Sequence, residues 1–389
     1  MPVPEHRTSH KVVVIGGGYA GTLAANRLRR RDDVAVTLVN PRPRFVDRVR
    51  LHQFAARTGE AELDYGTLLD DGVHLVVDSA TRIGTATRTV ELASGHALDY
   101  DYVVYAVGST GAVPSSVPGA AEFAVSTAEL ESARRLRGVL DELPAEAPVT
   151  VVGGGLTGIE TAAELVDRGR NVTLVCGGAL APSLSAPGRR HVVKWLSRHG
   201  VAVVEADRVA EVRPDAVVLA GGAVLPSALT VWTAGFAVPE LASASGLRTD
   251  DLGRLLTDET LTSVDDDRIV AAGDAAAPSG RPLRMSGQIA TPLGAHAADT
   301  VLSRVAGVEP AVLDVAFAGS CVSLGRHAGL RQFARKDDTA VNVCFGGRAG
   351  AAYKELTCKL GVWKIRREAR KPGSTTWLKG GHGLVTARW

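Results

Sequence analysis

Hydrophobic and polar positions along the chain repeat one pattern twice. Residues 11–15 form an apolar run, residues 21–30 have the mixed pattern of an amphipathic helix, and residues 34–39 form a second apolar run. The same order recurs between Val149 and Cys176. Short apolar runs bounded by glycine are typical of buried strands. Each copy therefore predicts a strand, a glycine turn, a helix and a second strand.

The rest of the pattern is shorter in period. Residues 89–100 predict a hairpin with Ser94-Gly95 at its turn. Beyond about residue 318 the pattern of apolar and polar residues predicts several short strands. Further elements are expected as a buried strand within 101–109, a helix near 127–143, a hairpin-like region within 201–235, and a strand before a small-residue turn within 261–277.

Residues 216–239 carry no charge and are long enough to span a bilayer as a helix. Gly221-Gly222 and Pro226 interrupt this stretch, however, and the apolar segments on either side look like separate strands joined by a turn. We therefore expect two buried strands here and no transmembrane helix.

Composition narrows the class of protein. The 389 residues suit two or three modules, 45% of them are hydrophobic, and the net charge of +2 is too small to indicate a nucleic-acid partner. None of the four cysteines is spaced as C-x-x-C, so we expect no metal site or redox pair, and a reducing, cytoplasmic setting is the default. The first residues have no apolar core of a signal peptide, which makes secretion unexpected.

The two glycine turns carry the chemistry. In G-x-G-x-x-G the first glycine allows a tight turn, the second lets the backbone approach a pyrophosphate, and the third lets the helix pack against the strand. The helix N-terminus favours the negative charge of the phosphates. The expected cofactor-binding residues are Gly16, Gly18, Tyr19, Ala20 and Gly21 in the first turn, and Gly153, Gly155 and Gly158 in the second.

Two such turns predict two dinucleotides, and the usual purpose of this pair is to lay a nicotinamide against a flavin. The strand after each turn usually ends in an acidic residue that binds the ribose, but here it ends in Asn40 and in Cys176. Asn40 can still accept a hydrogen bond through its amide oxygen. Cys176 is a poor acceptor and fits plain core packing, and no arginine directly follows it, since Arg189-Arg190 come later. The choice between NADH and NADPH stays open.

The motifs occur in the order found in flavoproteins with two dinucleotide sites. They are GGGYAG near the N-terminus, YAVGS at 105–109, GGGLTGIE at 153–160, VWTAG at 231–235 and AAGDAA at 271–276. Over about residues 10–310 the chain resembles the type II NADH:quinone oxidoreductases, within the pyridine nucleotide-disulfide oxidoreductase superfamily. The disulfide reductases are a poorer match, because the chain has no early cysteine pair.

The resemblance implies an α/β fold with two Rossmann-like domains, in which a split FAD domain contains an inserted NAD(P)H domain, and a small C-terminal region. The implied boundaries are 1–113 and 251–318 for FAD, 114–250 for NAD(P)H, and 319–389 for the C-terminal region. Asp274 would bind the FAD ribitol; its structural alternative is a helix N-cap, and the two roles can coexist. Glu160 would lie beside the nicotinamide and flavin, with an exposed first-turn glutamate as its alternative. Further expected cofactor contacts are Arg50, Gly108, Gly235 and Gly273.

Two segments depart from the family pattern. In the helix after the GD turn, Gln288 and Ala290 are kept, but Pro292-Leu293 stand where acceptor-lining glutamines are usual. Upstream, an apolar stretch near the flavin is replaced by FVDRVRLHQ, residues 45–53. Its polar side chains, Arg48, Arg50, His52 and Gln53, belong either to a solvated loop with salt bridges or to a site for a polar or acidic acceptor. Gln288, His52 and Glu160 are the catalytic candidates, the last two as proton donors.

The C-terminal segment 353–372 is basic and carries a tryptophan among spaced apolar residues. It fits an interfacial helix on an anionic membrane, as in the family, and equally a helix docked on the protein. The implied location is cytoplasmic, with peripheral contact at the inner face of the membrane. The oligomeric state stays open, a homodimer included.

Three functions compete. The first is an FAD-dependent oxidoreductase that passes a hydride from NAD(P)H to a quinone or quinone-like acceptor. The second is a soluble flavoenzyme of specialised metabolism that acts on another small molecule, which the two departures favour. The third is a non-catalytic nucleotide sensor.

Overall fold

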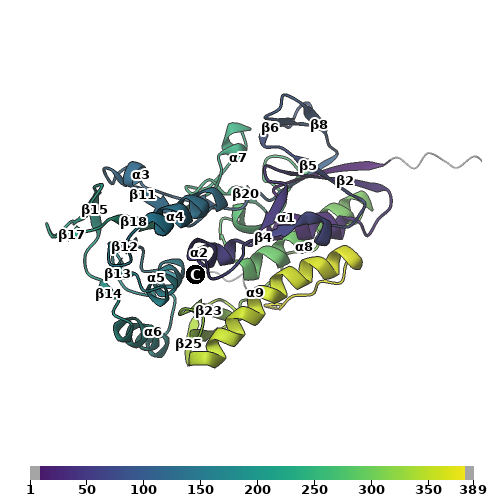
Figure 1. The fold of residues 1–389 in the computed structure, drawn as a ribbon. Coiled ribbons are helices and arrows are strands. Elements are labelled where there is room, and N and C mark those ends of the chain that lie inside the picture. Colours follow the sequence, from purple (N-terminus) through teal and green to yellow (C-terminus); the bar gives the residue numbers. More distant parts are fainter. Residues whose placement is uncertain (1–8, 382–389) are drawn as a thin grey trace, which may run out of the picture.

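Two five-stranded parallel sheets form the frame of the protein (Figure 1). We describe residues 9–381 of a computed structural model. The first sheet has the order β21 (Ile269–Ala271), β9 (Tyr102–Tyr105), β1 (His10–Ile15), β2 (Val34–Asn40), β5 (Val73–Val77). The second has the order β11 (Ala124–Ser126), β18 (Leu229–Trp232), β12 (Pro148–Val152), β13 (Asn171–Val175), β14 (Ala202–Val204). All neighbours within both sheets pair in parallel, so the predicted α/β class is confirmed.

Alternate residues of each central strand face two different cores. Val12 and Val14 of β1 pack against α1 (Tyr19–Leu28) and α8 (Gly287–Val305), whereas Val13 and Ile15 face the small antiparallel sheet described next. That sheet consists of β6 (Ala80–Gly84), β7 (Thr89–Leu92) and β8 (Ala97–Asp99), with α7 (Leu241–Ala244) beside it.

The second sheet is covered in the same way. One face packs on helices α4 (Leu130–Glu142), α5 (Leu156–Asp167) and α6 (Ala186–Arg198). The other face packs on β15 (Val209–Val212) and β16 (Ala216–Leu219), to which β17 (Val224–Pro226) is added, and on α3 (Ala120–Phe123). This repeated layering follows from the repeated hydrophobic pattern, because strands covered on both faces need apolar residues at nearly every position.

The C-terminal region joins the two units. Strands β23 (Gly319–Ser323), β24 (Gly329–Ala334) and β25 (Ala340–Gly346) form an antiparallel sheet, and α9 (Gly347–Arg370) runs from this sheet back along α1 (Figure 1). Arg27 of α1 binds the fully buried carboxylate of Glu368 at 3.1 Å, which anchors the far end of α9.

The remaining elements are short. They are β3 (Arg44–Val46), η1 (Arg48–Arg50), α2 (Leu51–Ala55), β4 (Glu62–Asp64), η2 (Tyr65–Thr67), β10 (Thr110–Gly111), β19 (Phe236–Ala237), β20 (Leu255–Thr257), η3 (Gly273–Ala275) and β22 (Ala276–Pro278).

Most predicted elements are found within a few residues of their expected positions. The hairpin with Ser94-Gly95 at its turn is β7 and β8, and the helix expected near 127–143 begins at Leu130. The uncharged stretch 216–239 contains β16, β17, β18 and β19, of which β16 and β18 are the two buried strands expected. None of the described helices is long and apolar enough to cross a membrane. The expectation about the first eight residues, and the part of the C-terminal segment after residue 381, lie outside the described residues.

Candidate active site

Both glycine turns have the geometry that their spacing predicts. A side chain on Gly21 would come within 1.8 Å of the Gly16 carbonyl oxygen, and one on Gly158 within 1.9 Å of the Gly153 carbonyl oxygen, so the third glycine of each turn is needed for helix packing. At Gly18 and Gly155, by contrast, no other atom lies within 4 Å of where a Cβ would be. The protein leaves open the place where a pyrophosphate would approach, so both turns fit a dinucleotide.

Asn40 takes part in shaping the first turn. Its Oδ1 accepts a hydrogen bond from the Gly17 N–H at 2.9 Å, and its Nδ2 donates to the Arg42 carbonyl oxygen at 2.7 Å. The Tyr65 hydroxyl donates to the Gly17 carbonyl oxygen at 2.6 Å. Asn40 therefore holds the turn in place, and it also lines a cavity of about 320 Å³ beside it, here named the glycine-turn cavity.

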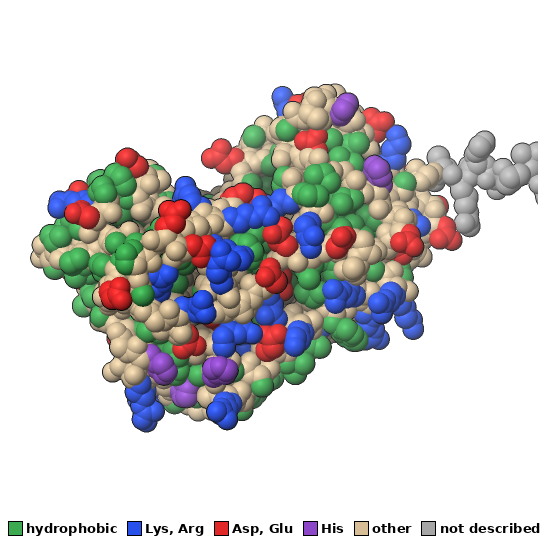
Figure 2. All heavy atoms as spheres, viewed as in Figure 1, with side chains coloured by type: hydrophobic (Ala, Val, Ile, Leu, Met, Phe, Trp, Pro, Cys, Tyr) green, Lys and Arg blue, Asp and Glu red, His purple; other side chains and the backbone are tan. Residues whose placement is uncertain are grey.

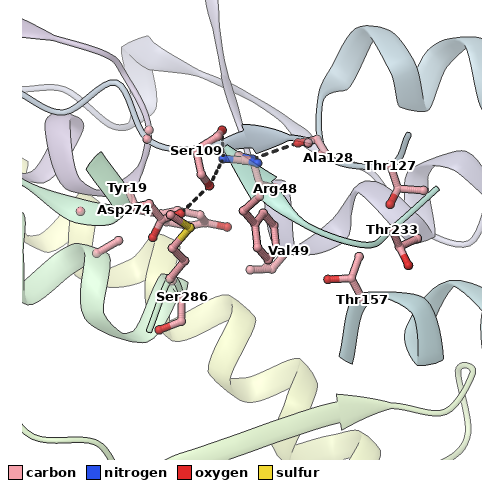
Figure 3. Close-up of a pocket in the computed structure, with 18 of the residues that line it drawn as sticks. Tyr19, Arg48, Val49, Ser109, Thr127, Ala128, Thr157, Thr233, Asp274 and Ser286 are labelled. Carbon is pink, nitrogen blue, oxygen red and sulfur yellow. Dashed lines mark hydrogen bonds between the residues drawn. The ribbon is translucent and has the colours of Figure 1, made fainter. Parts of the chain in front are cut away.

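A second cavity, of about 220 Å³, is named here the central cavity, and Figure 3 shows residues that line it. The residues common to both linings are Gly18, Arg48, Ala106, Gly108, Ser109 and Ala128. Expected site residues that line the central cavity are Gly18, Tyr19, Ala20, His52, Gly108, Glu160, Gly235, Gly273 and Asp274. The central cavity thus gathers residues from both glycine units, from the GD turn and, through Lys354, from α9.

Asp274 belongs to a chain of polar contacts on one wall of the central cavity. The Ser109 hydroxyl donates to Asp274 Oδ2 at 2.7 Å, and Arg48 donates to the Ser109 carbonyl oxygen at 2.7 Å and to that of Ala128 at 3.1 Å (Figure 3). The alternative role as a helix N-cap is wrong, because the cap of η3 is Ala272 and the carboxylate binds Ser109 instead. Burial lowers the pKa of Arg48, and the negative charge of Asp274 opposes this shift.

Glu160 is buried, so its alternative as an exposed glutamate is wrong. Its Oε1 lies 2.7 Å from Lys354 Nζ and accepts the Ser323 N–H at 2.9 Å. Burial alone would raise the pKa of Glu160, but the positive charge of Lys354, together with His52 and the hydrogen bonds from Lys354 and Ser323, outweighs burial and lowers this pKa. Burial alone would likewise lower the pKa of Lys354, and the Glu160 carboxylate raises it well above its usual value. Both groups are therefore ionised, beside the central cavity.

His52 lies on α2 and is only 5% exposed. Its Nε2 has no hydrogen-bond partner within the described chain, and the ring lines the central cavity. Burial lowers the pKa of His52 to about 4, with Glu160 opposing the shift and Lys354 adding to it. The imidazole is thus neutral near pH 7, and its Nε2 is buried without a partner in the described chain.

The segment 45–53 has no exposed residue, so it is not solvated, but it does contain the ion pairs of the first alternative. Arg50 forms two 3.0 Å hydrogen bonds with Glu355 and lies 3.3 Å from Asp47, which accepts the Tyr19 hydroxyl. Arg50 lines neither cavity, whereas Arg48 lines both, so the structure favours Arg48 over Arg50 as the arginine that faces a cofactor.

Gln288 also lies away from the central cavity. Its side chain is exposed and, with its amide oriented to satisfy both partners, it accepts from the Ala318 N–H at 2.8 Å and donates to the Gly319 carbonyl oxygen at 2.9 Å. Ala290, two residues further along α8, does line the cavity. Gln288 therefore holds the start of β23, a contact that no motif in the sequence predicted.

The second dinucleotide strand ends beside an acidic residue after all. Glu205 follows the neighbouring strand β14, accepts the Leu180 N–H at 3.0 Å and pairs with Arg189. Burial raises the pKa of the Cys176 thiol to about 11, and the charge of Glu205 adds to the shift. Cys176 is accordingly a half-buried neutral thiol, with a carboxylate supplied from the next strand.

Comparison with known proteins agrees with this geometry. The family model described as pyridine nucleotide-disulphide oxidoreductase matches residues 10–298. An NADH dehydrogenase-like protein of Mycobacterium tuberculosis is 34% identical over 293 residues, which cover 69% of this chain and 73% of the relative. A type II NADH:quinone oxidoreductase of Staphylococcus haemolyticus is 26% identical and covers 91% of this chain and 96% of its own. The structure of NDH2 from Plasmodium falciparum in complex with NADH has a TM-score of 0.79 at 15% identity, with coverage of 93% and 97%.

Proposed function

Because the chain belongs to the pyridine nucleotide-disulphide oxidoreductase family, and is an NAD(P)H-dependent flavoprotein that uses FAD, we propose that its electron acceptor is a quinone or a quinone-like molecule. One observation carries the proposal. The central cavity is lined by Gly18 and Ala20 of the first glycine unit and by Thr157 and Glu160 of the second. Two nucleotides held on these turns would bring their reactive rings into the same cavity.

The residues of the chain would bind, orient and shield the cofactors. When bound, FAD and NAD(P)H supply the hydride transfer itself. Gly18 and Gly155 admit the two pyrophosphates, and Asp274, fixed by Ser109, offers a carboxylate to the hydroxyls of the flavin side chain. Tyr19 lines the cavity, and its ring packs edge-on against Phe45 with 5.3 Å between the ring centroids. Its hydroxyl donates to Asp47 and stays neutral, since burial raises its pKa.

Reduction of a quinone needs one proton beyond the hydride: NAD(P)H + H⁺ + quinone gives NAD(P)⁺ + hydroquinone. Lys354 holds a proton at Nζ beside the central cavity, and Glu160 fixes that ammonium group in position. The neutral His52 imidazole lies in the same lining. We assign to Glu160 and Lys354 the positioning of this proton, and to His52 its exchange with the cavity.

The second candidate, a soluble flavoenzyme that acts on another small molecule, has one observation in its favour. The position of the usual acceptor-lining glutamines is occupied by Pro292 and Leu293, both of which are buried inside α8. The third candidate, a nucleotide sensor with degenerate sites, is disfavoured by the open glycine turns and by the buried charged pair in the central cavity.

Contact with a membrane surface is a further part of the proposal. The exposed side of α9 carries Leu356, Leu360 and Trp363 at helical spacing, with exposed fractions of 52%, 40% and 49%. Val362 and Ile365, on the opposite side of α9, are buried in the core that β1 forms with α1 and α8. Helix α9 is therefore docked on the protein and still has an exposed apolar stripe. Lys359, Arg367 and Arg370 flank the stripe, and Figure 2 shows many Lys and Arg side chains on this side of the molecule. This charge favours an anionic membrane over a second copy of the chain.

The test of the main proposal has two stages. The purified protein should be yellow, and it should bleach under anaerobic conditions when NADH or NADPH is added. Reoxidation should then be faster with a naphthoquinone than with small enones or aldehydes at equal concentration. Bleaching without any quinone preference would select the second candidate, and a colourless protein that FAD cannot reconstitute would end the proposal.

A further inference from the structure

A third cavity lies on the far side of the Lys354–Glu160 pair. It has a volume of about 310 Å³, within the range of small-molecule sites, roughly 300–1,000 Å³. We name it the basic cavity; its lining residues are Gln53, Ser323, Gly325, Arg326, His327, Arg348, Ala351, Ala352, Lys354 and Glu355.

The central cavity and the basic cavity meet at a single shared lining residue. Lys354 lines both cavities. Glu160 lines the central cavity and accepts the N–H of Ser323, which lines the basic cavity. The successive residues His52 and Gln53 of α2 likewise line the two opposite sides. An acceptor in the basic cavity would therefore lie against the same ammonium group that borders the cofactor site.

The charges of the basic cavity are not balanced. Lys354 is neutralised by Glu160, and Glu355 by Arg50, with which it forms two 3.0 Å hydrogen bonds. Arg326 and Arg348 remain. Both residues are exposed, and neither guanidinium has a hydrogen bond or an ion pair within residues 9–381. The Arg326 N–H is bound to Asp167 at 3.1 Å, and the positive charge of Arg326 acts on Glu164, whose pKa it lowers against the effect of burial. Arg348 also lies in the first turn of α9, where the helix dipole adds positive potential.

The lining is also too polar for a lipophilic tail. Its only hydrophobic side chains are the methyl groups of Ala351 and Ala352. A long isoprenoid chain would need apolar walls, since burying it among unpaired cations would cost the hydration of those cations without replacing it. A carboxylate or sulfonate, in contrast, would form charge-assisted hydrogen bonds with the two arginines.

We propose that the basic cavity binds the anionic substituent of the electron acceptor, which makes the acceptor a quinone-like ring that carries a carboxylate or sulfonate. This inference rests on the proposed function and specifies its substrate class. The net reaction is NAD(P)H + H⁺ + anionic quinone to NAD(P)⁺ + anionic hydroquinone, in which the quinone gains two electrons and two protons and its charged substituent is unchanged. Lys354 contacts the acceptor side of the wall and donates a hydrogen bond to the ring oxygen.

The test compares two acceptors on the FAD-loaded protein: 1,4-naphthoquinone and its 2-sulfonate. Arg348→Gln and Arg326→Gln should each raise the KM for the sulfonate about tenfold and leave the KM for the neutral quinone within about twofold, because only the sulfonate makes the charge-assisted contact. For each quinone, the KM of a variant is divided by the KM of the wild type. This ratio cancels the difference in reduction potential between the two quinones. Arg348→Lys should recover part of the loss, and Arg82→Gln, an exposed arginine on the distant strand β6, should change neither value.

A binding measurement separates this proposal from the proposed function. The redox-inert naphthalene-2-sulfonate should bind the oxidised protein in calorimetry, about tenfold more weakly in Arg348→Gln, and more weakly again in high salt. If the arginine variants raise the KM equally for both quinones, or for neither, the basic cavity is not an acceptor site, even where NAD(P)H still bleaches the flavin. Binding of phosphatidylglycerol vesicles that depends on Arg348, with unchanged sulfonate kinetics, would overturn it in favour of a lipid headgroup. Failure of the bleaching step itself would instead overturn the proposed function.

Discussion

Lys354 Nζ lies 2.7 Å from Glu160 Oε1, although nearly half of the chain separates the two residues. Glu160 comes from the helix that follows the second glycine turn, and Lys354 comes from the C-terminal helix. The pair is buried, with side-chain exposures of 14% and 9%. It forms part of the wall between the central cavity and the basic cavity, so one ion pair joins the second dinucleotide unit to the C-terminal region at the proposed reaction centre.

We first predict that Glu160→Gln slows turnover about tenfold or more, because the ammonium group of Lys354 loses the partner that positions it. The same change should lower the free energy of unfolding by about 3–5 kcal/mol, since it leaves a buried charge unpaired. Lys354→Met should cost a similar amount. The double variant should recover most of the lost free energy of unfolding but none of the lost turnover rate. Urea unfolding measures the first quantity, and steady-state rates at equal FAD occupancy measure the second. Full activity of Glu160→Gln would remove the pair from the mechanism.

The second prediction uses the two glycines of the second turn. Gly155→Ala meets no protein atom, so the protein should fold and bind FAD normally while its KM for NAD(P)H rises about tenfold or more, because the methyl group occupies the pyrophosphate position. Gly158→Ala is the matched control: its methyl group would come within 1.9 Å of the Gly153 carbonyl oxygen and should lower the melting temperature instead. The idea fails if Gly155→Ala has an unchanged KM, as measured by flavin reduction at varied nucleotide concentration.

The glycine units could be predicted from the sequence because their information is local. The turn, the strand before it and the helix after it lie within about 30 residues, and each glycine has a steric role that the spacing alone reports. The same holds for the division of the uncharged stretch 216–239, where Gly221-Gly222 and Pro226 determine the outcome.

The partners of the candidate site could not be predicted, because their contacts are distant in sequence. Nothing around Lys354 distinguishes it from the other cations of a basic amphipathic helix, and only the fold brings it to Glu160. The polar segment 45–53 gave two alternatives, and the structure divides its arginines between them: Arg50 forms ion pairs, and Arg48 faces the cavities. Gln288 resembled an acceptor ligand by its motif but binds the backbone of residues 318–319.

The third prediction concerns pH. Burial lowers the pKa of His52 to about 4, from an ordinary value of 6.5. Between these two values the unfolded chain binds a proton at this position that the folded protein does not, so the free energy of unfolding falls as the pH decreases through this window. Between pH 6.5 and 5 this amounts to about 2 kcal/mol. Burial also lowers the pKa of His296, which adds a loss of the same sign.

The measurement is urea unfolding at pH 7 and pH 5 for the wild type and for His52→Gln. Between pH 7 and pH 5, the free energy of unfolding should fall by about 2 kcal/mol less in the variant than in the wild type, whatever the stability of the variant at pH 7. His74→Gln, at an exposed position on β5, is the control and should keep the wild-type difference. Identical pH dependence in His52→Gln and the wild type would contradict the assignment.

The fourth prediction concerns the apolar stripe on α9. Replacing Leu356, Leu360 and Trp363 by serine should abolish cosedimentation with vesicles that contain phosphatidylglycerol, because the apolar side chains supply the insertion energy. Melting temperature should change little, since these side chains are exposed. Replacing exposed Val224 and Val343 by serine is the control for lost apolar surface elsewhere. A change in oligomeric state by light scattering, with no vesicle binding in the wild type, would show that the stripe is a contact between two copies of the chain.

The last prediction concerns the choice of nucleotide. Cys176 directly follows β13, the strand after the second glycine turn, and Glu205 directly follows the neighbouring strand β14. The Glu205 carboxylate therefore lies beside Cys176, where the Leu180 N–H and Arg189 bind it. A 2′-phosphate at this position would meet that negative charge, so we expect NADH to be preferred over NADPH. Glu205→Gln removes the repulsion and frees Arg189, and it should raise the ratio of kcat/KM for NADPH to that for NADH about tenfold. Glu205→Gln/Arg189→Gln should lose most of this gain, because the freed cation supplies much of the attraction for the phosphate. A wild-type protein that already prefers NADPH, or a ratio that stays constant in Glu205→Gln, would show that the carboxylate does not face the ribose.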